Sequence, residues 1–384
     1  MLMGGCLFSL IINPLTSGSI PGLALGVLSF QEVNMKLYLE NGYFNFDKVR
    51  TFAEEHKIAF VYVIGGRGTG KTYGAIDSYL YDRPAPFIWL RRTQSQADII
   101  SKPEFNPFKK NAKTREWTPV MSPISKYNSG IYEGVEDETG KLVPHGLPKG
   151  YTAALSTFSN IRGFDADDAE AIIWDEFIPE VHERPIKNEA EAFFNAYETV
   201  NRNRELEGRP PLIAFCLANS NDLGNPIFMY AGHVKTCLDM RKKGQDFFVD
   251  FNRGYMIIML DESLISQMKK ETVLYKYTGG TAFENMSLSN VFFGEADIRT
   301  FSRPLAEYKS VVTAGELTVY KHKGNQRPLY VTFHRRGTCP TYGGGDTELK
   351  RFAGRYAWLW NAYMNNRVEF EDYGAELLFL RYFK

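Results

Sequence analysis

Short, nearly continuous runs of apolar residues recur along the first two thirds of the chain, and glycine, polar or charged residues end each of them. Runs of this length without alternation are typical of strands buried on both faces, as in a parallel sheet covered by helices. Helical spacing at 72–81 and 189–206 and the turn glycines of a hairpin at 127–148 separate these runs. We expect strands at residues 58–64, 87–90, 151–158, 171–174, 212–217 and 247–260. This pattern predicts an α/β domain.

The pattern changes after residue 295. Three short apolar stretches predict an antiparallel meander, followed by helices at 347–365 and at the chain's end. Residues 269–290 are polar and glycine-bearing, which is typical of a linker or lid. The stretches of the meander are 311–312, 317–320 and 329–333. The predicted parts of the chain are an α/β domain over 35–264, a linker or lid over 265–295 and a smaller α+β domain over 296–384.

The first 34 residues are apolar and rich in small residues, but they lack a basic start, and Pro14 and Pro21 interrupt them. A secretory signal needs early positive charge, and a membrane-spanning helix needs about 20 unbroken apolar residues. We therefore expect Met35 to be the physiological start and residues 1–34 to be a non-native upstream extension. An ordered arm is the alternative.

One stretch of the α/β domain carries recognisable chemistry. Residues 65–72 have the pattern G-x-x-x-x-G-K-T and lie between a predicted strand and a predicted helix. The glycines let backbone N–H groups turn toward a phosphate, and the helix N-terminus adds partial positive charge. Lys71 is expected to reach the β- and γ-phosphates of a nucleotide, and Thr72 to ligate Mg²⁺. The predicted nucleotide-binding residues are Gly65, Gly66, Arg67, Gly68, Thr69, Gly70, Lys71 and Thr72.

A second chemical signal ends the strand predicted at 171–174, where Asp175 and Glu176 follow the apolar run directly. Roughly 100 residues after a phosphate loop, this pair favours ATP hydrolysis. Asp175 would hold Mg²⁺ through water, and Glu176 would polarise the attacking water. No guanine-reading N-K-x-D motif is evident. Asn219 follows the run at 212–217, at the sheet edge where α/β proteins present their sites; a strand-end cap is its alternative role.

Composition narrows the classes of function. Lys+Arg and Asp+Glu are both 45, so the formal net charge is zero, which argues against a protein coated in basic charge without excluding local basic patches. Lys109, Lys110 and Lys113 form one such patch, which is either a phosphate-contacting loop for DNA or a solvated loop. The four cysteines have no C-x-x-C spacing and the six histidines no H-x-x-x-H pair, so neither offers a zinc site.

The combination resembles the DNA-packaging (encapsidation) ATPases of small, protein-primed tailed bacteriophages, a branch of the large-terminase superfamily. The resemblance implies a P-loop ATPase of the additional-strand, catalytic-glutamate type, followed by a smaller RNase H-like domain. It covers nearly everything after Met35. The residues that carry it are 65–72, 91–92, 174–178, 200–204, 216–219, 286–290 and the last helix at 352–383.

The resemblance also implies a function and partners. The implied protein is an ATP-driven motor that moves double-stranded DNA into a preformed procapsid, with ATP and Mg²⁺ as cofactors. It would act as a homo-oligomeric ring, expected to be pentameric, on the portal (connector) of the procapsid in the cytoplasm of an infected bacterium. Some relatives add a packaging RNA, and no membrane is involved.

In such rings an arginine from the neighbouring subunit completes each active site. Arg202 matches this arginine finger, Arg162 matches a second basic residue that acts in trans, and Asn219 resembles the coupling residue. Helical spacing turns Arg202 away from the subunit's core and Arg204 toward it. A surface salt bridge is the alternative role for Arg162 and for Arg202.

The matching first strand of the C-terminal domain, at 308–315, contains no acid. Nucleases of this fold need one there, as one of several carboxylates that bind two metals. We therefore interpret the domain as nuclease-dead and adapted to bind DNA, portal or packaging RNA. The basic residues at 321–323 and 335–336 are either contact points for such a partner or solvated surface charge. Two alternatives stay open. A terminase that also cuts DNA would need a carboxylate cluster here, and a nucleotide-dependent assembly switch would not need Glu176.

Overall fold

A computed structural model describes residues 35–161, 166–179, 183, 186–219, 223–260, 264–279, 281, 301–324 and 327–383, and every structural statement below concerns these residues. The predicted upstream extension, residues 1–34, lies outside them, as do residue 280 and residues 282–295 of the predicted linker or lid. Within the described ranges, no helix is both long and apolar enough to cross a membrane.

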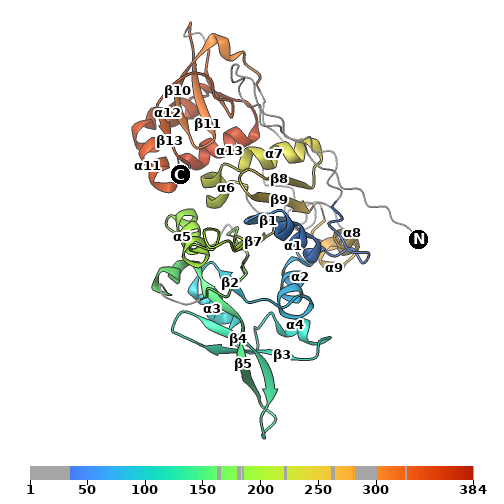
Figure 1. Ribbon diagram of the computed structural model, residues 1–384. Coiled ribbons are helices and arrows are strands. Elements are labelled where there is room, and N and C mark those ends of the chain that lie inside the picture. The colour runs from blue at the N-terminus through green and yellow to red at the C-terminus, as the bar shows by residue number, and fades with distance from the viewer. Residues whose placement is uncertain are drawn as a thin grey trace, which may run out of the picture. The chain divides into compact units, whose positions relative to one another are not determined.

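A nine-stranded sheet organises the part of the chain predicted as the α/β domain, with the strand order β3-β4-β5-β2-β6-β7-β1-β9-β8 (Figure 1). Its parallel strands are β1 (Phe60–Gly65), β2 (Phe87–Arg91), β5 (Leu142–Ala154), β6 (Ala171–Asp175), β7 (Ile213–Ala218) and β9 (Tyr255–Leu260). Antiparallel strands extend both edges: β3 (Thr118–Pro123), β4 (Ser129–Glu136) and β8 (Phe247–Asp250). The predicted parallel sheet is confirmed. The strand predicted at 151–158 is wrong beyond Ala154, because residues 155–161 form a 3-10 helix.

Helices cover both faces of this sheet, which explains why its central strands are apolar throughout. Phe46 of α1 packs on Phe215 of β7, with ring centroids 4.8 Å apart. On the opposite face, Phe193 of α5 packs on Trp174 of β6 at 4.6 Å. The helices of this domain are α1 (Phe46–Glu55), α2 (Lys71–Asp77), α3 (Gln94–Ile100), α4 (Lys109–Ala112), α5 (Glu189–Asn201), α6 (Pro226–Ala231) and α7 (Val234–Lys243). A π-helical turn, Ser78–Asp82, prolongs α2.

Helix α5 is shorter than predicted. It ends at Asn201, so the expectation of a helix to residue 206 is wrong. Arg202 has φ 46°, a left-handed conformation that cannot continue a right-handed helix. The buried side chain of Asn201 accepts a hydrogen bond from the backbone N–H of Leu212 at 2.9 Å, which ties the helix end to the start of β7. A tertiary contact therefore sets the end of α5.

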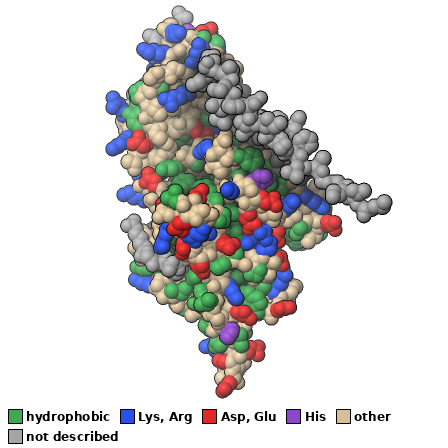
Figure 2. All heavy atoms as spheres, viewed as in Figure 1, with side chains coloured by type: hydrophobic (Ala, Val, Ile, Leu, Met, Phe, Trp, Pro, Cys, Tyr) green, Lys and Arg blue, Asp and Glu red, His purple; other side chains and the backbone are tan. Residues whose placement is uncertain are grey.

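Strands β4 and β5 continue beyond the rest of the sheet as a long hairpin (Figure 1), as the turn glycines predicted. Acidic side chains gather at its end (Figure 2), where Glu136, Asp137 and Glu138 are exposed. Asp137 organises the turn, since its carboxylate accepts backbone hydrogen bonds from Thr139 and Lys141. The tip of the hairpin therefore carries three exposed acids and one exposed base, Lys141.

Two short helices, α8 (Leu264–Lys270) and α9 (Val273–Tyr277), begin the segment predicted as a linker or lid. Beyond it lies a second sheet, in the order β13-β10-β11-β12-β14. Its strands are β10 (Tyr308–Ala314), β11 (Leu317–His322), β12 (Leu329–Thr332), β13 (Thr341–Tyr342) and β14 (Val368–Phe370), with β10, β11 and β12 forming the predicted antiparallel meander. Its helices are α11 (Asp346–Arg355), α12 (Ala357–Met364) and α13 (Tyr373–Tyr382). The helix predicted at 347–365 is thus two helices that meet at Tyr356.

The tight turn between β10 and β11 docks on helix α7. The carboxylate of Glu316 accepts hydrogen bonds from the backbone N–H groups of Val234 and Lys235, both at 3.1 Å, and so caps the N-terminus of α7. Burial raises the pKa of Glu316 to about 7, although these two backbone hydrogen bonds oppose the shift. At the other end of α7, Lys242 pairs with Asp372 at 2.6 Å.

Candidate nucleotide-hydrolysis site

The loop between β1 and α2 surrounds the side chain of Lys71, the first residue of α2. The ammonium of Lys71 donates hydrogen bonds to the carbonyl oxygens of Gly65 and Gly66, at 2.8 and 2.9 Å. Gly68 and Gly70 have φ values of 74° and 95°, which side-chain-bearing residues rarely adopt. Burial lowers the pKa of Lys71 to about 7, and the nearby Asp175 carboxylate opposes this shift. The lysine thus lies inside the glycine-rich loop and is held by the carbonyl oxygens of that loop.

Two consecutive carboxylates, Asp175 at the end of β6 and Glu176 directly after it, line the same cavity as this loop. The hydroxyl of Thr72 donates a hydrogen bond to Asp175 Oδ1 at 2.9 Å, so the two predicted metal ligands are adjacent. Asp175 is buried, and this burial raises its pKa, whereas Arg91 acts in the opposite direction. Glu176 is more exposed and has φ 60°, in the left-handed region. The turn after β6 therefore directs the two acids into different environments, one buried and one open to solvent.

Arg91, at the end of β2, bridges both acids. Its Nη1 lies 2.8 Å from Asp175 Oδ2, and its Nη2 lies 2.5 Å from Glu176 Oε2. Sequence reasoning used Arg91 only as part of the resemblance and gave it no role. Its position depends on the parallel pairing of β2 with β6, whose carboxyl ends coincide with Leu90 opposite Trp174, and the sequence alone does not reveal that pairing. The adjacent Arg92 differs: it is buried and paired with Glu189 at 2.6 Å, a structural contact.

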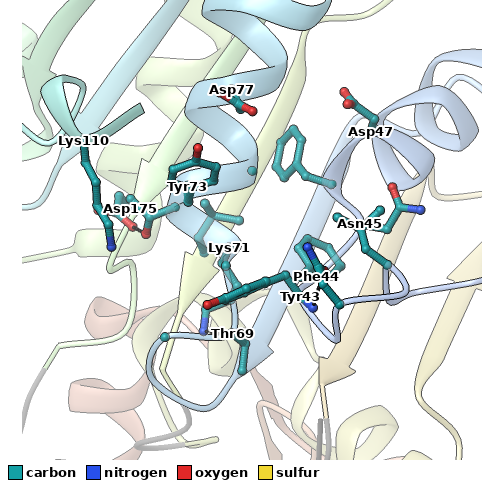
Figure 3. Close-up of a pocket in the computed structure, with 18 of the residues that line it drawn as sticks. Tyr43, Phe44, Asn45, Asp47, Thr69, Lys71, Tyr73, Asp77, Lys110 and Asp175 are labelled. Carbon is teal, nitrogen blue, oxygen red and sulfur yellow. Dashed lines mark hydrogen bonds between the residues drawn. The ribbon is translucent and has the colours of Figure 1, made fainter. Parts of the chain in front are cut away.

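A cavity of about 780 Å³ opens over the loop and the two acids (Figure 3). Asn219, at the end of β7, lines it, as expected of a residue at this sheet edge. Lys110, predicted to contact DNA, also lines this cavity, whereas Lys109 and Lys113 are exposed on and beside α4. Of the three lysines grouped together in the sequence, one therefore lies at the candidate nucleotide site.

The segment before α1 forms one wall of the cavity, and sequence reasoning missed it. The backbone N–H of Phe44 donates to the carbonyl oxygen of Thr69 at 2.8 Å, which fixes the segment against the phosphate loop. Tyr43 packs on Gly70, where an added Cβ would lie 3.1 Å from its ring (Figure 3). Asn45 caps α1 by accepting a hydrogen bond from the N–H of Lys48. No periodic pattern or motif distinguishes this stretch.

The predicted trans-acting arginines lie apart from this cavity or outside the described residues. Arg202 is exposed, and its Nε donates to the Thr199 carbonyl at 3.3 Å; it is not among the described residues that line the cavity. Arg204 is buried and donates to the carbonyl oxygen of Ala169. The two side chains thus differ in exposure as expected, but a left-handed turn at Arg202, not helical spacing, is responsible. Arg162 lies outside the described residues.

The C-terminal acids are engaged in separate contacts. Glu369 pairs with Arg303 at 2.8 Å, Glu371 accepts a hydrogen bond from the Thr332 hydroxyl at 2.6 Å, and Asp346 accepts one from the Asn188 N–H at 3.0 Å. Glu316 caps α7, as described above. In the described part of the chain, no group of three or more His, Cys, Asp or Glu side chains is arranged to hold a metal ion.

Comparisons with known proteins find phage packaging proteins. The family model described as Podovirus DNA encapsidation protein (Gp16) matches residues 138–320. The DNA packaging protein of Bacillus phage B103 is 26% identical over 228 residues, which cover 57% of this chain and 67% of that protein. The DNA packaging protein of Bacillus phage phi29 is 25% identical over 248 residues, covering 62% and 63%. The chain therefore aligns with about two thirds of the length of these relatives.

Solved structures show the same likeness in the fold. A chain of the bacteriophage Phi-29 viral genome packaging motor assembly superposes with a TM-score of 0.54 at 19% identity, over 89% of this chain and 100% of that chain. The Phi-28 gp11 DNA packaging motor gives 0.51 at 17% identity, over 88% and 97%. The mixed α/β fold therefore resembles that of phage packaging proteins. The resemblance that the motifs indicated is confirmed: this chain is similar to the podovirus DNA encapsidation proteins, over residues 138–320 for the family model.

Proposed function

We propose that this protein is an ATP-driven motor that moves double-stranded viral DNA into a preformed procapsid. The observation that carries the ATPase part is the convergence of Lys71, Thr72, Asp175 and Glu176 on one cavity at the carboxyl ends of parallel strands. Neither a phosphate loop nor an acidic pair alone would indicate hydrolysis, but a chain that brings them together can bind a triphosphate and direct water at it.

Each group has a role that its position supports. The loop N–H groups and Lys71 would bind the phosphates, and Glu176, half exposed after β6, would orient the attacking water. Thr72 and Asp175 offer the oxygen ligands that Mg²⁺ prefers, and they already lie 2.9 Å apart. When bound there, Mg²⁺ would neutralise charge on the phosphates. In the structure, the guanidinium of Arg91 supplies positive charge beside the Asp175 carboxylate.

The sheet order supports the additional-strand type of P-loop ATPase. Strand β7 lies between β1, which leads into the phosphate loop, and β6, which carries the acids. Asn219 follows β7 and so lies between the two halves of the site, a position suited to coupling nucleotide state to movement. For the C-terminal domain, the acid-free strand β10 and the separately engaged acids support an RNase H-like domain without nuclease activity.

The remaining parts of the proposal concern assembly. Arg202 is exposed and absent from the cavity of its own chain among the described residues, which supports a finger that acts on a neighbour in a homo-oligomeric ring. The relatives named as DNA packaging proteins support double-stranded DNA as the cargo. The resemblance adds a pentameric ring on the procapsid portal, in the cytoplasm of the infected host, with a packaging RNA in some relatives.

The test separates binding of ATP from its hydrolysis. Lys71→Ala should abolish nucleotide binding or turnover, whereas Glu176→Gln should keep ATP binding and lose turnover, because only the group that orients water is gone. Binding is measured with a fluorescent ATP analogue and turnover by phosphate release. Glu138→Gln, in the exposed hairpin tip, is the matched control. Hydrolysis by Glu176→Gln at the wild-type rate would refute the assignment.

A further inference from the structure

Lys269 of α8 contacts the phosphate loop, although neither the loop motif nor its spacing predicts a role for it. Its ammonium donates a hydrogen bond to the carbonyl oxygen of Arg67, 202 residues away along the chain. It also lines the same cavity as Gly68 and Lys71. The segment predicted as a linker or lid therefore brings a cation to the candidate nucleotide site.

The side chain of Lys269 lies close against the loop backbone at Gly68. A Cβ placed on Gly68 would lie 2.2 Å from Lys269 Nζ and 3.1 Å from its Cε, so a side chain at position 68 would displace the lysine ammonium. The φ of 74° at Gly68 independently favours glycine. The lysine therefore lies directly on the loop backbone, unlike a side chain that merely extends over a surface.

The charges around Lys269 favour an anion. Burial, followed by the neighbouring Arg67, lowers the pKa of Lys269, and Lys269 is one of the groups that lower the pKa of Lys71. Within the described residues, Lys269 makes no ion pair with a carboxylate. Holding like charges together at a partly buried loop is unfavourable. An anion bound among them would offset that repulsion with charge-assisted hydrogen bonds.

We propose that Lys269 contacts the β/γ end of the bound nucleoside triphosphate, its ammonium moving from the Arg67 carbonyl oxygen to a phosphate oxygen. The ligand is a phosphate chain because Lys269 and Lys71 line one cavity with the glycine loop that precedes α2, and such loops bind phosphate through their backbone N–H groups. Lys269 and Lys71 would then together neutralise the negative charge of the phosphate chain. This inference rests on the nucleotide site proposed above.

The experiment measures ATP affinity and steady-state hydrolysis in three variants of the full chain. Loss of one charge-assisted hydrogen bond should weaken ATP binding by roughly tenfold or more in Lys269→Ala. KM should rise by a similar factor while kcat changes less, since the lost contact would hold substrate and transition state alike. Lys269→Arg should restore most of the affinity. Lys276 of α9 forms an exposed ion pair with Glu271, and Lys276→Ala should leave the affinity for ATP unchanged.

The outcomes separate the two proposals. If the wild-type protein neither binds nor hydrolyses ATP, the proposed function fails. If the wild type does both and Lys269→Ala binds ATP within twofold of Lys276→Ala, only the role of Lys269 is overturned. Equal melting temperatures of the variants show that the fold is intact; if Lys269→Ala does not fold, Lys269→Gln is compared in the same way. Failure of Lys269→Arg to recover affinity would also count against a phosphate contact.

Discussion

Replacing Arg91 by methionine tests the electrostatics of the candidate site directly. Arg91 and Asp175 are each only 12% exposed, and their charged atoms are 2.8 Å apart. Removing one partner of such a buried pair leaves an uncompensated charge and costs about 3–5 kcal/mol. The contact with Glu176 adds less, because the Glu176 side chain is 52% exposed and surface pairs contribute about 0–1 kcal/mol. We therefore expect Arg91→Met to lower the free energy of unfolding of the first domain by about 3 kcal/mol.

Thermal melting followed by circular dichroism is the assay. For a domain of this size the expected loss lowers Tm by about 6–12 °C. Arg351→Met is the matched control, since Arg351 pairs with Glu348 at 2.8 Å but is 71% exposed, and it should melt close to the wild type. Mg²⁺ should stabilise Arg91→Met more than the wild type, because a divalent cation can compensate the Asp175 carboxylate that Arg91 has left.

The pH dependence of this loss has a defined sign. Burial already raises the pKa of Asp175, and Arg91 is the main group that lowers it, so the variant must raise that pKa further. A protonated Asp175 needs no counter-charge. The difference in Tm between wild type and variant should therefore shrink as pH falls through the acid range. A difference that is below 2 °C at neutral pH, or that grows on acidification, would refute the reasoning.

Three further predictions concern other parts of the chain. Rings made only of Arg202→Ala subunits and rings made only of Lys71→Ala subunits should both be inactive. Mixed rings should recover some ATP hydrolysis, because a subunit with an intact phosphate loop can use Arg202 of a neighbour. If rings shown to be mixed recover no hydrolysis, a finger that acts in trans is unsupported. In salt titrations of DNA binding, Lys109→Ala and Lys113→Ala should each reduce the slope of log affinity against log salt by about 1, and an unchanged slope would place the DNA contact elsewhere. Burial raises the folded-state pKa of Glu316 from 4.5 to about 7, so the stability that the protonated side chain contributes is lost as pH rises from 4.5 to 7. Glu316→Gln should make the free energy of unfolding less dependent on pH in this range, as measured by denaturation at several pH values.

Most of the sheet was predictable because its information is local. Strands covered on both faces need continuous apolar runs, and the phosphate loop needs its glycines and lysine at fixed spacing. Asp175 and Glu176 were predictable for the same reason, since an apolar run followed directly by two acids can be recognised within a few consecutive residues. The meander of the C-terminal domain was equally evident from short apolar stretches and turns.

The missed features depend on which distant segments meet. Arg91 bridges the acids only because β2 pairs with β6, and a pairing between strands 84 to 85 residues apart leaves no periodic trace. Helix α5 ends early because Asn201 is tied to the N–H of Leu212, a contact that helical spacing cannot anticipate. Lys110 and Lys269 reach the cavity through the placement of short helices, whose charged side chains look like solvated surface in the sequence.

The backbone of Glu176 has a consequence for how the site would change under selection. A φ of 60° is strained for a residue with a side chain and costs on the order of 1 kcal/mol, whereas glycine adopts it freely and asparagine readily. In a library screened for folding alone, glycine or asparagine should therefore accumulate at position 176, and under the proposed function the resulting proteins would be more stable but inactive in ATP hydrolysis. If glutamate is retained at position 176 despite this backbone conformation, selection for activity must have outweighed selection for stability there.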